Sequence, residues 1–308
     1  MFEPTTQKNT QPTTMKTRIQ FLLLASSLVA LPNFVQAQPS AQYVPGSEGI
    51  KGASLPPPGL YVRDYNYFYW ADQFNDSYGN DAHVPNADVF TYANIPRVIW
   101  ITDTKVLGGF IGVDGLLPLV YQSVKAGGYD SSTFGIGDFF GEGTISWHPK
   151  QFDFAIGSGV WAPTGDSGPP PTTRIGAGYW TFMQTAGATW YIDEEKTWAV
   201  SALNRYEFNT EQRDTHVTPG QAYTLEWGVS KGVCKEADLG VVGYYQQQVT
   251  ANSGSPASSR NRVAAVGPEV NVVFPDLMLF VSLRYNYEFM AENRAQGNAV
   301  TLTLTKRF

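Results

Sequence analysis

The chain has 308 residues, of which 14% are aromatic and only 16% charged, whereas a soluble globular chain carries about a quarter charged residues. A mean hydropathy of −0.22 excludes a bundle of membrane helices. The net charge of −6 argues against nucleic acid as a partner, because phosphates need a basic face. A single cysteine, Cys234, excludes an internal disulfide and a cysteine-based metal cluster, and no motif predicts a metal or a cofactor.

The first 37 residues predict a secretory signal peptide. Met15–Arg18 is a short basic start, and the apolar run "IQFLLLASSLVAL" of about 13 residues follows it, below the ~20 that a spanning helix needs. Small residues then precede a cleavage site between Ala37 and Gln38, and the residues before Met15 would be extra. The alternative is a buried N-terminal helix. The mature chain is expected to be exported.

Residues 38–59, "QPSAQYVPGSEGIKGASLPPPG", are too rich in Pro and Gly for a helix or a sheet. One interpretation is a disordered periplasmic tail. The other is a plug folded into a barrel lumen, because Tyr43, Val44, Ile50 and Leu55 are apolar for a linker.

From Leu60 to Phe308 the sequence alternates strand-like segments with turn-rich breaks and shows no sustained helical period. About twelve strands are expected, near residues 60–73, 89–102, 106–121, 134–147, 152–162, 175–191, 198–209, 222–231, 239–249, 263–274, 277–290 and 298–308. Long polar breaks such as "QSVKAGGYDSST" and "AENRAQG" take turns with short ones such as "HPKQ" and "FPD". A sandwich does not require that alternation, whereas a transmembrane barrel has short periplasmic turns and long external loops. We therefore predict an all-β, antiparallel outer-membrane barrel with one lipid-facing side and one polar lumen.

Alternation along the strands places a set of charged residues on the inward side. The candidates for lining the lumen or permeation path are Asp64, Arg97, Asp138, Glu142, Arg205, Glu207, Glu226, Glu269, Arg284 and Glu288. They could set selectivity, or they could form a salt-bridge network that only stiffens the wall. Tyr179, Met183, Phe280 and Met290 share that face and are candidate contacts for an apolar solute.

Two features concern the wall itself. Pro96 falls inside the second strand, where proline removes a ladder donor, so it marks a wall kink or a misplaced strand boundary. A kink there could give apolar solutes a lateral exit, gated by residues 38–59. The ending "VTLTLTKRF" alternates strictly, which predicts a closing strand with Phe308 at the periplasmic interface. We expect the barrel-assembly machinery to engage this strand.

The chain resembles the SphA-like outer-membrane barrels of the meta-pathway of phenol degradation, which are treated as transporters. The resemblance rests on an ordered set of motifs: "YVPGSEG" (43–49), "LPPPGLY" (55–61), "ITDTKVLGG" (101–109), Gly137-Asp138, "WAPTGD" (161–166), "YWTF" (179–182), "YEFNTE" (206–211), "VGPEV" (266–270) and "AENRAQG" (291–297). It implies a channel for small, largely hydrophobic molecules, often encoded near aromatic catabolism. Lys306 and Arg307 depart from the more apolar end of related barrels.

The function expected from these observations is passive uptake of small hydrophobic or aromatic molecules across a Gram-negative outer membrane, without catalysis. Its partners would be the lipid bilayer and those solutes. Two alternatives remain: a barrel hydrolase with a catalytic His83 or His216 in a long loop, and a structural or adhesive barrel.

Overall fold

The computed structural model describes residues 41–166, 174–254 and 260–308. The predicted signal peptide, its cleavage at Ala37–Gln38, the start at Met15 and the first residues of the Pro/Gly-rich segment lie outside the described residues. All described residues belong to one compact unit of the chain.

The described residues form fourteen β-strands and one short 3-10 helix. They are β1 (Gly59–Asn75), β2 (Asp88–Val106), β3 (Gly109–Leu116), β4 (Leu119–Ala126), β5 (Tyr129–Ile136), β6 (Phe139–Trp147), β7 (Phe152–Ala162), β8 (Thr181–Tyr191), β9 (Trp198–Asn209), β10 (Ala222–Cys234), β11 (Ala237–Gln248), β12 (Arg262–Phe274), η1 (Pro275–Leu277), β13 (Leu279–Glu292) and β14 (Arg294–Arg307). Within the described part of the chain, no helix is long and apolar enough to cross a membrane.

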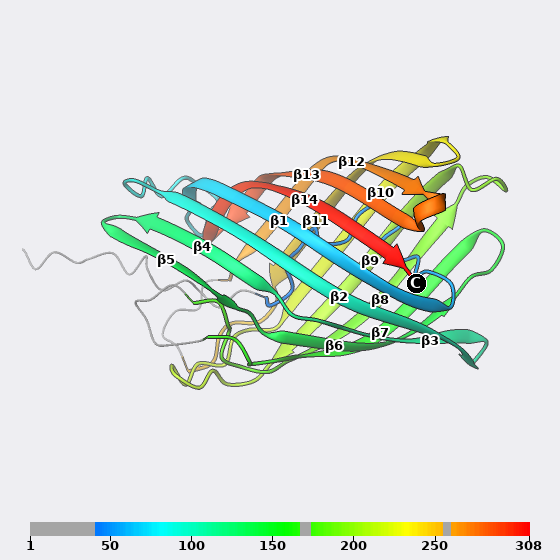
Figure 1. Cartoon of the computed structure of the whole chain (residues 1–308). Coiled ribbons are helices and arrows are strands. Elements are labelled where there is room, and N and C mark those ends of the chain that lie inside the picture. Colours follow the sequence, from blue (N-terminus) through cyan, green and yellow to red (C-terminus); the bar gives the residue numbers. More distant parts are fainter. Residues whose placement is uncertain (1–40, 167–173, 255–259) are drawn as a thin grey trace, which may run out of the picture. The chain divides into compact units, whose positions relative to one another are not determined.

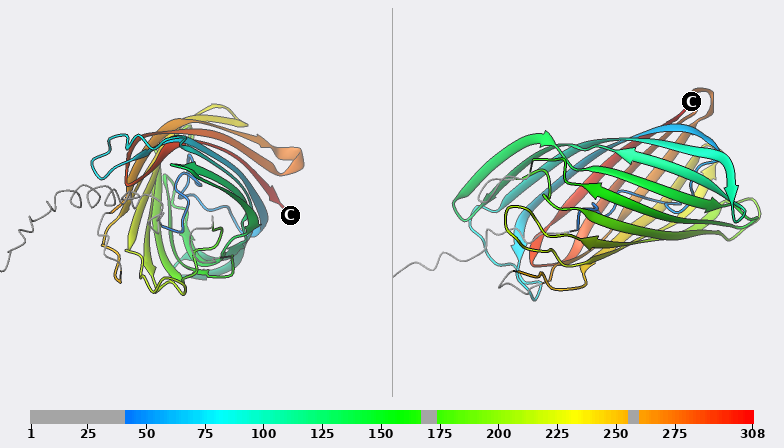
Figure 2. Two further views of the ribbon diagram at one scale, coloured as in Figure 1. Left: turned by 90° about the vertical axis from the view of Figure 1, so that its left-hand side faces the viewer. Right: turned by 90° about the horizontal axis from the view of Figure 1, so that it is seen from below.

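The strands form one antiparallel sheet that closes on itself (Figures 1 and 2). β1 pairs with β14 on one side and with β2 on the other, so the first and last strands meet. β3 and β4 are two halves of one crossing, interrupted at Leu117–Pro118, and β5 and β6 are two halves of the next, interrupted at Gly137–Asp138. The wall therefore has twelve crossings, and the predicted twelve-stranded barrel is confirmed.

The two faces of the wall have the polarity of a membrane barrel rather than of a soluble one. On β9, for example, Trp198 and Phe208 are exposed, whereas Ser201, Arg205 and Glu207 are buried. Alternate residues of a strand point to opposite faces, so the apolar side chains face outward and the polar ones face the lumen.

Several predicted boundaries are wrong. β2 continues through the expected break at residues 103–105 and ends at Val106. The expected loop at residues 122–133 is a tight hairpin between β4 and β5, in which Gly127 and Gly128 have φ of 57° and 93° and provide a mirror-image turn. The expected loop at 291–297 is a turn at Asn293, whose φ is 52°. Conversely, residues 175–180 are irregular, and β8 begins only at Thr181. Polarity and glycine content do not exclude a strand whose side chains face a wet lumen or solvent.

Pro96 lies inside β2, opposite Asp64 on an unbroken β1–β2 ladder. On its other side, β2 changes partner: Asn94 pairs with Leu119 of β4, and Arg97 pairs with Leu116 of β3. The Pro96 carbonyl accepts a hydrogen bond from the Leu117 amide at 3.3 Å, so the N–H that proline lacks would face the same side. The proline therefore coincides with the break in the neighbouring crossing.

Candidate functional site

Residues 41–58, here called the inner segment, run inside the ring of strands (Figure 2). Their hydrogen bonds reach side chains of β9, β10, β11 and β12, more than 160 positions away in the sequence. The candidate site is the lumen together with this segment.

Tyr43 anchors the first part of the inner segment. Its hydroxyl donates to Glu226 Oε2 at 2.7 Å and its amide to Glu207 Oε1 at 3.1 Å. The guanidinium of Arg205 lies 4.0 Å from the centre of the Tyr43 ring and pairs with Glu226. The ring also packs in an apolar cluster with Phe140, Trp161 and Met183.

Glu48 joins the middle of the inner segment to β1 and β2. Its carboxylate is 3.0 Å from Arg63 Nη1 and 3.3 Å from Arg97 Nη1, and it accepts the Tyr65 hydroxyl at 2.7 Å. Burial alone would raise the pKa of Glu48, but the two arginines outweigh burial and lower that pKa from about 4.5 to about 2. Glu48 is therefore held ionised as part of a charged bridge.

The far part of the inner segment fits against glycines in the wall. The Ile50 amide donates to Glu269 Oε2 at 2.9 Å. A Cβ on Gly240 of β11 would lie 2.5 Å from Ile50 Cγ2, and one on Gly187 of β8 would lie 2.8 Å from Ala53 Cβ. Both approaches are closer than any side chain permits, so these strands require glycine where the segment passes.

Most of the predicted lumen residues do face inward and are buried or, for Arg97, nearly so. These are Arg97, Glu142, Arg205, Glu207, Glu226, Glu269, Arg284 and Glu288. They form linked groups rather than one row: Arg97 bonds Asp114 at 2.8 Å, and Glu288 accepts the hydroxyls of Tyr69 and Tyr244, each at 2.9 Å. Whether they line a permeation path stays a prediction.

Asp138 has a different position from the other predicted lumen residues. It lies at the break between β5 and β6, where its carboxylate accepts the amides of Gly165 and Ala177, both at 2.8 Å. It thus fixes the two ends of the connection between β7 and β8 against the hairpin.

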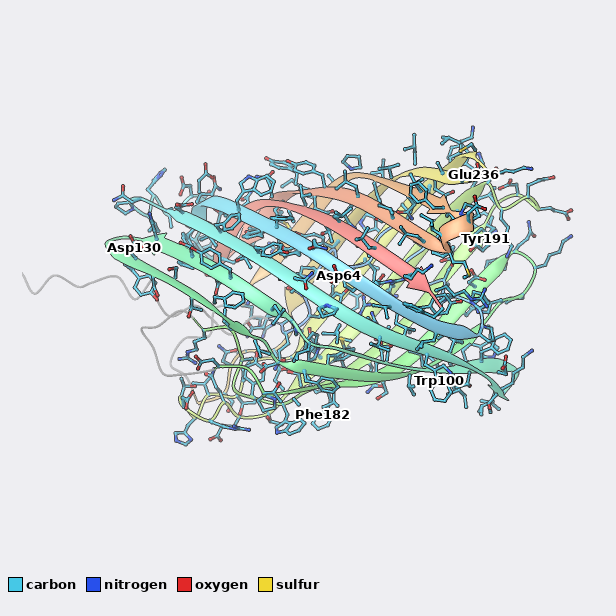
Figure 3. The ribbon with its side chains drawn as sticks, viewed as in Figure 1. Asp64, Trp100, Asp130, Phe182, Tyr191 and Glu236 are labelled. Carbon is cyan, nitrogen blue, oxygen red and sulfur yellow. The ribbon has the colours of Figure 1, made fainter. Side chains whose placement is uncertain are left out.

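The prediction for Asp64 is wrong. Tyr61 and Tyr65, which lie on the opposite face of β1 from Asp64, are buried. Leu60 and Phe68, which lie on the same face as Asp64, are exposed. Asp64 therefore lies on the outer wall, midway along β1 (Figure 3). Hydropathy misassigned the face because the inward tyrosines are large and aromatic, yet their hydroxyls donate to lumen carboxylates such as Glu48.

The four predicted apolar contacts are not together. Met183 and Tyr179 are buried at 1% and 3% exposure. Phe280 is 44% exposed and pairs with Thr305 near the short-turn end, and Met290 is half-buried beside a bulge in β12. Only the first two lie near Tyr43.

Sequence reasoning missed Arg63, Tyr65 and Glu48 as site residues. The signal that could have found Glu48 is a lone acid inside a Pro/Gly-rich segment that otherwise carries apolar residues. In the described part of the chain, no group of three metal-ligating side chains comes together. The charged bridge at Glu48 and the apolar cluster around Tyr43 could select molecules in the lumen by charge and by shape.

Comparison with solved structures shows the fold. The chain is similar to an outer membrane channel from Pseudomonas putida F1, with 15% identity and a TM-score of 0.75 over 87% of this chain and 100% of that one. It is also similar to the β domain of the Bordetella autotransporter Brka, with 12% identity and a TM-score of 0.50 over 82% of this chain and 100% of that one. None of the curated proteins is significantly similar in sequence. A family model described as "Putative MetA-pathway of phenol degradation" matches residues 71–304, and the chain belongs to that family.

Proposed function

We propose that the protein is an outer-membrane channel for passive uptake of small hydrophobic or aromatic molecules. A closed barrel with an apolar outer wall and a charged interior suits a channel. The description of the family links it to a pathway of phenol degradation. The similar barrel from Pseudomonas putida F1 is described as an outer membrane channel. Export by a signal peptide cleaved after Ala37 belongs to the same proposal.

The observation that carries the proposal is the inner segment, which we infer to be a plug. It bridges β1, β2, β9 and β10 through Glu48 and Tyr43, so it crosses the lumen rather than following one strand. A permanently open aqueous pore has no use for such a bridge. A plugged lumen with charged walls favours a route on which an apolar solute need not cross a wet pore.

The route we propose leaves the lumen sideways. An apolar solute of one or two hundred Å² would lose roughly 2.5–5 kcal/mol of favourable burial in a wet axial pore. The wall offers two irregularities in one region: the ladder break beside Pro96, and β5, which among the described strands pairs only with β4. The exit proposed for Pro96 would thus lie next to the β4–β5 hairpin.

The direct test is uptake by liposomes that contain the purified protein. Entry of phenol should be faster than into protein-free liposomes, and entry of a sugar of similar size should be accelerated much less. Equal acceleration of both solutes would contradict a hydrophobic route, and no acceleration of phenol would contradict the channel itself.

Replacing Pro96 with valine tests the lateral exit. Valine restores an N–H on the side of β2 where the neighbouring crossing breaks, so it should extend the ladder and slow phenol uptake several-fold while sparing small polar solutes. Pro275→Val, in the exposed turn of η1, is the matched control. If both solute classes enter Pro96→Val vesicles at the wild-type rate, the exit is axial.

We infer transport rather than catalysis. His216 Nδ1 lies 2.7 Å from Glu211 and His83 Nδ1 lies 3.2 Å from Asp81, and both imidazoles are at least 80% exposed. Solvated loop imidazoles with a carboxylate neighbour do not make a nucleophile–base pair. A hydrolytic activity that is lost in His83→Ala or His216→Ala would overturn this inference.

A further inference from the structure

A polar cluster lies on the outer wall, where the surrounding side chains face lipid. Asp64 accepts the side-chain amides of Asn66 and Asn94, at 2.9 and 2.8 Å, and Asn66 accepts the Tyr92 hydroxyl at 3.0 Å. All four side chains lie on the face that also carries exposed Phe68. The outer wall thus has a carboxylate midway along β1.

A carboxylate in this position is costly unless it is hydrogen-bonded. On the β14 side of β1, Asp64 pairs with Leu304 and Asn66 pairs with Leu302. Both leucines are apolar residues on the lipid-facing side. The two amides occupy one site on each oxygen of Asp64, and a carboxylate accepts about four hydrogen bonds. Asp64 therefore has acceptor capacity that these two amides do not fill.

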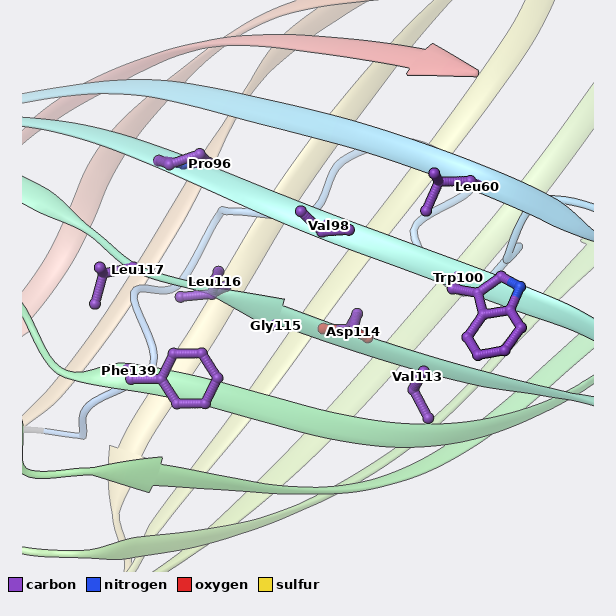
Figure 4. A pocket seen from close by; sticks show the side chains of 10 residues that line it. All are labelled: Leu60, Pro96, Val98, Trp100, Val113, Asp114, Gly115, Leu116, Leu117 and Phe139. Atoms are coloured by element: carbon purple, nitrogen blue, oxygen red, sulfur yellow. The ribbon is translucent and has the colours of Figure 1, made fainter. Parts of the chain in front are cut away.

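An apolar groove of about 700 Å³ runs along the same outer wall (Figure 4). Pro96, Val98 and Trp100 of β2 form one side, and Val113, Leu117 and Phe139 are among the residues of the other. Gly115 lies between them, and a Cβ there would be 3.3 Å from the Phe139 ring, so the glycine keeps the groove open. Its volume is sufficient for an aromatic molecule with a short alkyl chain.

The groove and the carboxylate meet at Pro96, which lines the groove and is the direct cross-strand partner of Asp64. We propose that they form one binding site for a membrane-dissolved aromatic molecule with a hydroxyl group. The ring and its substituent occupy the groove, and the hydroxyl donates a hydrogen bond to Asp64. The proposal rests on the proposed function for the solute class and adds the feature by which the protein selects it.

A phospholipid acyl chain fits the groove less well as the occupant, because it carries no donor at that depth and leaves Asp64 unsatisfied. A second copy of the chain would have to present its own donor against Asp64. A phenolic hydroxyl is carried by an apolar body and can donate a hydrogen bond to a carboxylate, so a phenol matches both parts of the site.

Photocrosslinking tests the site directly. The protein in liposomes is exposed to an alkylphenol carrying a diazirine, or to the methyl ether of the same compound, and labelled residues are mapped by mass spectrometry. The phenol should label residues 96–117 and Phe139, and should bind about tenfold more tightly than the ether. Asp64→Leu should remove that preference without removing labelling.

Gly115→Val fills the groove and should abolish labelling by both probes. Gly143→Ala is the matched control, because it adds a methyl group to the exposed face of β6, where a Cβ would meet nothing within 4 Å. It should leave labelling unchanged.

Three outcomes would overturn the inference: equal labelling by phenol and ether in the wild type, competition by acyl-chain lipid but not by unlabelled phenol, or a dimer that Asp64→Leu converts to a monomer. Liposome uptake separates this failure from that of the channel. Uptake without labelling of the groove would contradict only the proposed binding site. Labelling without uptake would contradict only the proposed channel function.

Discussion

At the scale of single residues, Glu48 is one carboxylate that ties the inner segment to two strands. Its side chain is 12% exposed and lies between Arg63 and Arg97. Arg97 has two further carboxylates, Asp114 and Glu142, whereas the one ion pair of Arg63 in the described structure is with Glu48. Loss of the Glu48 charge therefore weakens the attachment of the segment at β1 first.

Glu48→Gln should loosen the inner segment by roughly 1.5–3 kcal/mol, the worth of a hydrogen bond to a charged group in a partly buried ion pair. The lumen would then open more often, and single-channel conductance or sugar entry into liposomes should rise. Glu236→Gln, at the exposed turn after β10, is the matched control. Unchanged conductance in Glu48→Gln would show that other contacts hold the segment.

The same carboxylate predicts a pH dependence. Since the pKa of Glu48 is lowered from about 4.5 to about 2, its contribution is fully present above about pH 4.5 and is lost as the pH falls toward 2. Wild-type conductance should be constant from neutral pH down to about 5 and rise below that. The rise should be smaller in Glu48→Gln, and an equal rise in both proteins would assign it to other groups.

At the scale of elements, the β4–β5 hairpin is the least supported part of the wall. β5 pairs with β4 on one side. On its other side it meets the connection between β7 and β8: a Cβ on Gly135 of β5 would lie 4.0 Å from the Cβ of Ile175 in that connection. Asp138 holds both ends of that connection in place. Contacts between side chains and backbone there replace the ladder that joins the other strands.

A disulfide between Gly135→Cys and Ile175→Cys should form, because this Cβ separation lies within the usual range. In a Cys234→Ser background, oxidation should slow phenol uptake several-fold, and reduction should restore it. Each single-cysteine variant serves as a control. If the oxidised and reduced proteins transport phenol equally, the boundary beside β5 is not part of the route.

The strands and their closure could be predicted from the sequence because lipid imposes a strict alternation and the turns alternate in length. Which face of β1 is inward could not be predicted, since aromatic residues occupy both faces. The burial and the hydroxyl partners of Tyr65 and Tyr69 identify the inward one. The bridge from Glu48 could not be predicted either, because Arg97 is 49 positions away and no local pattern encodes the contact.

At the scale of the whole molecule, closure depends on β14, which pairs with β13 and with β1. Phe308 follows it; its amide donates to the Leu60 carbonyl at 2.9 Å, while its ring is 67% exposed. The exposed ring buries little of its surface against the barrel itself. Its position at the end of the closing strand suits recognition during assembly.

Phe308→Ala should therefore change the stability of the refolded barrel by no more than about 0.5 kcal/mol. In cells, the amount of heat-modifiable barrel in the outer membrane should fall severalfold, because the assembly machinery loses its contact. Leu302→Ala, on the outer face of the same strand, is the control. Equal losses in vitro and in cells would assign Phe308 a structural role instead.

The break shared by two adjacent crossings has a consequence for how this barrel can evolve. β3 and β6 are antiparallel neighbours up to Leu116 and Phe140, so the β4–β5 hairpin is an insertion between two strands that already pair. The half of the ring at the short-turn end closes without it. A change in the length or sequence of the hairpin would leave the β3–β6 ladder intact, so we expect such changes to alter the solute without disturbing closure at the short-turn end.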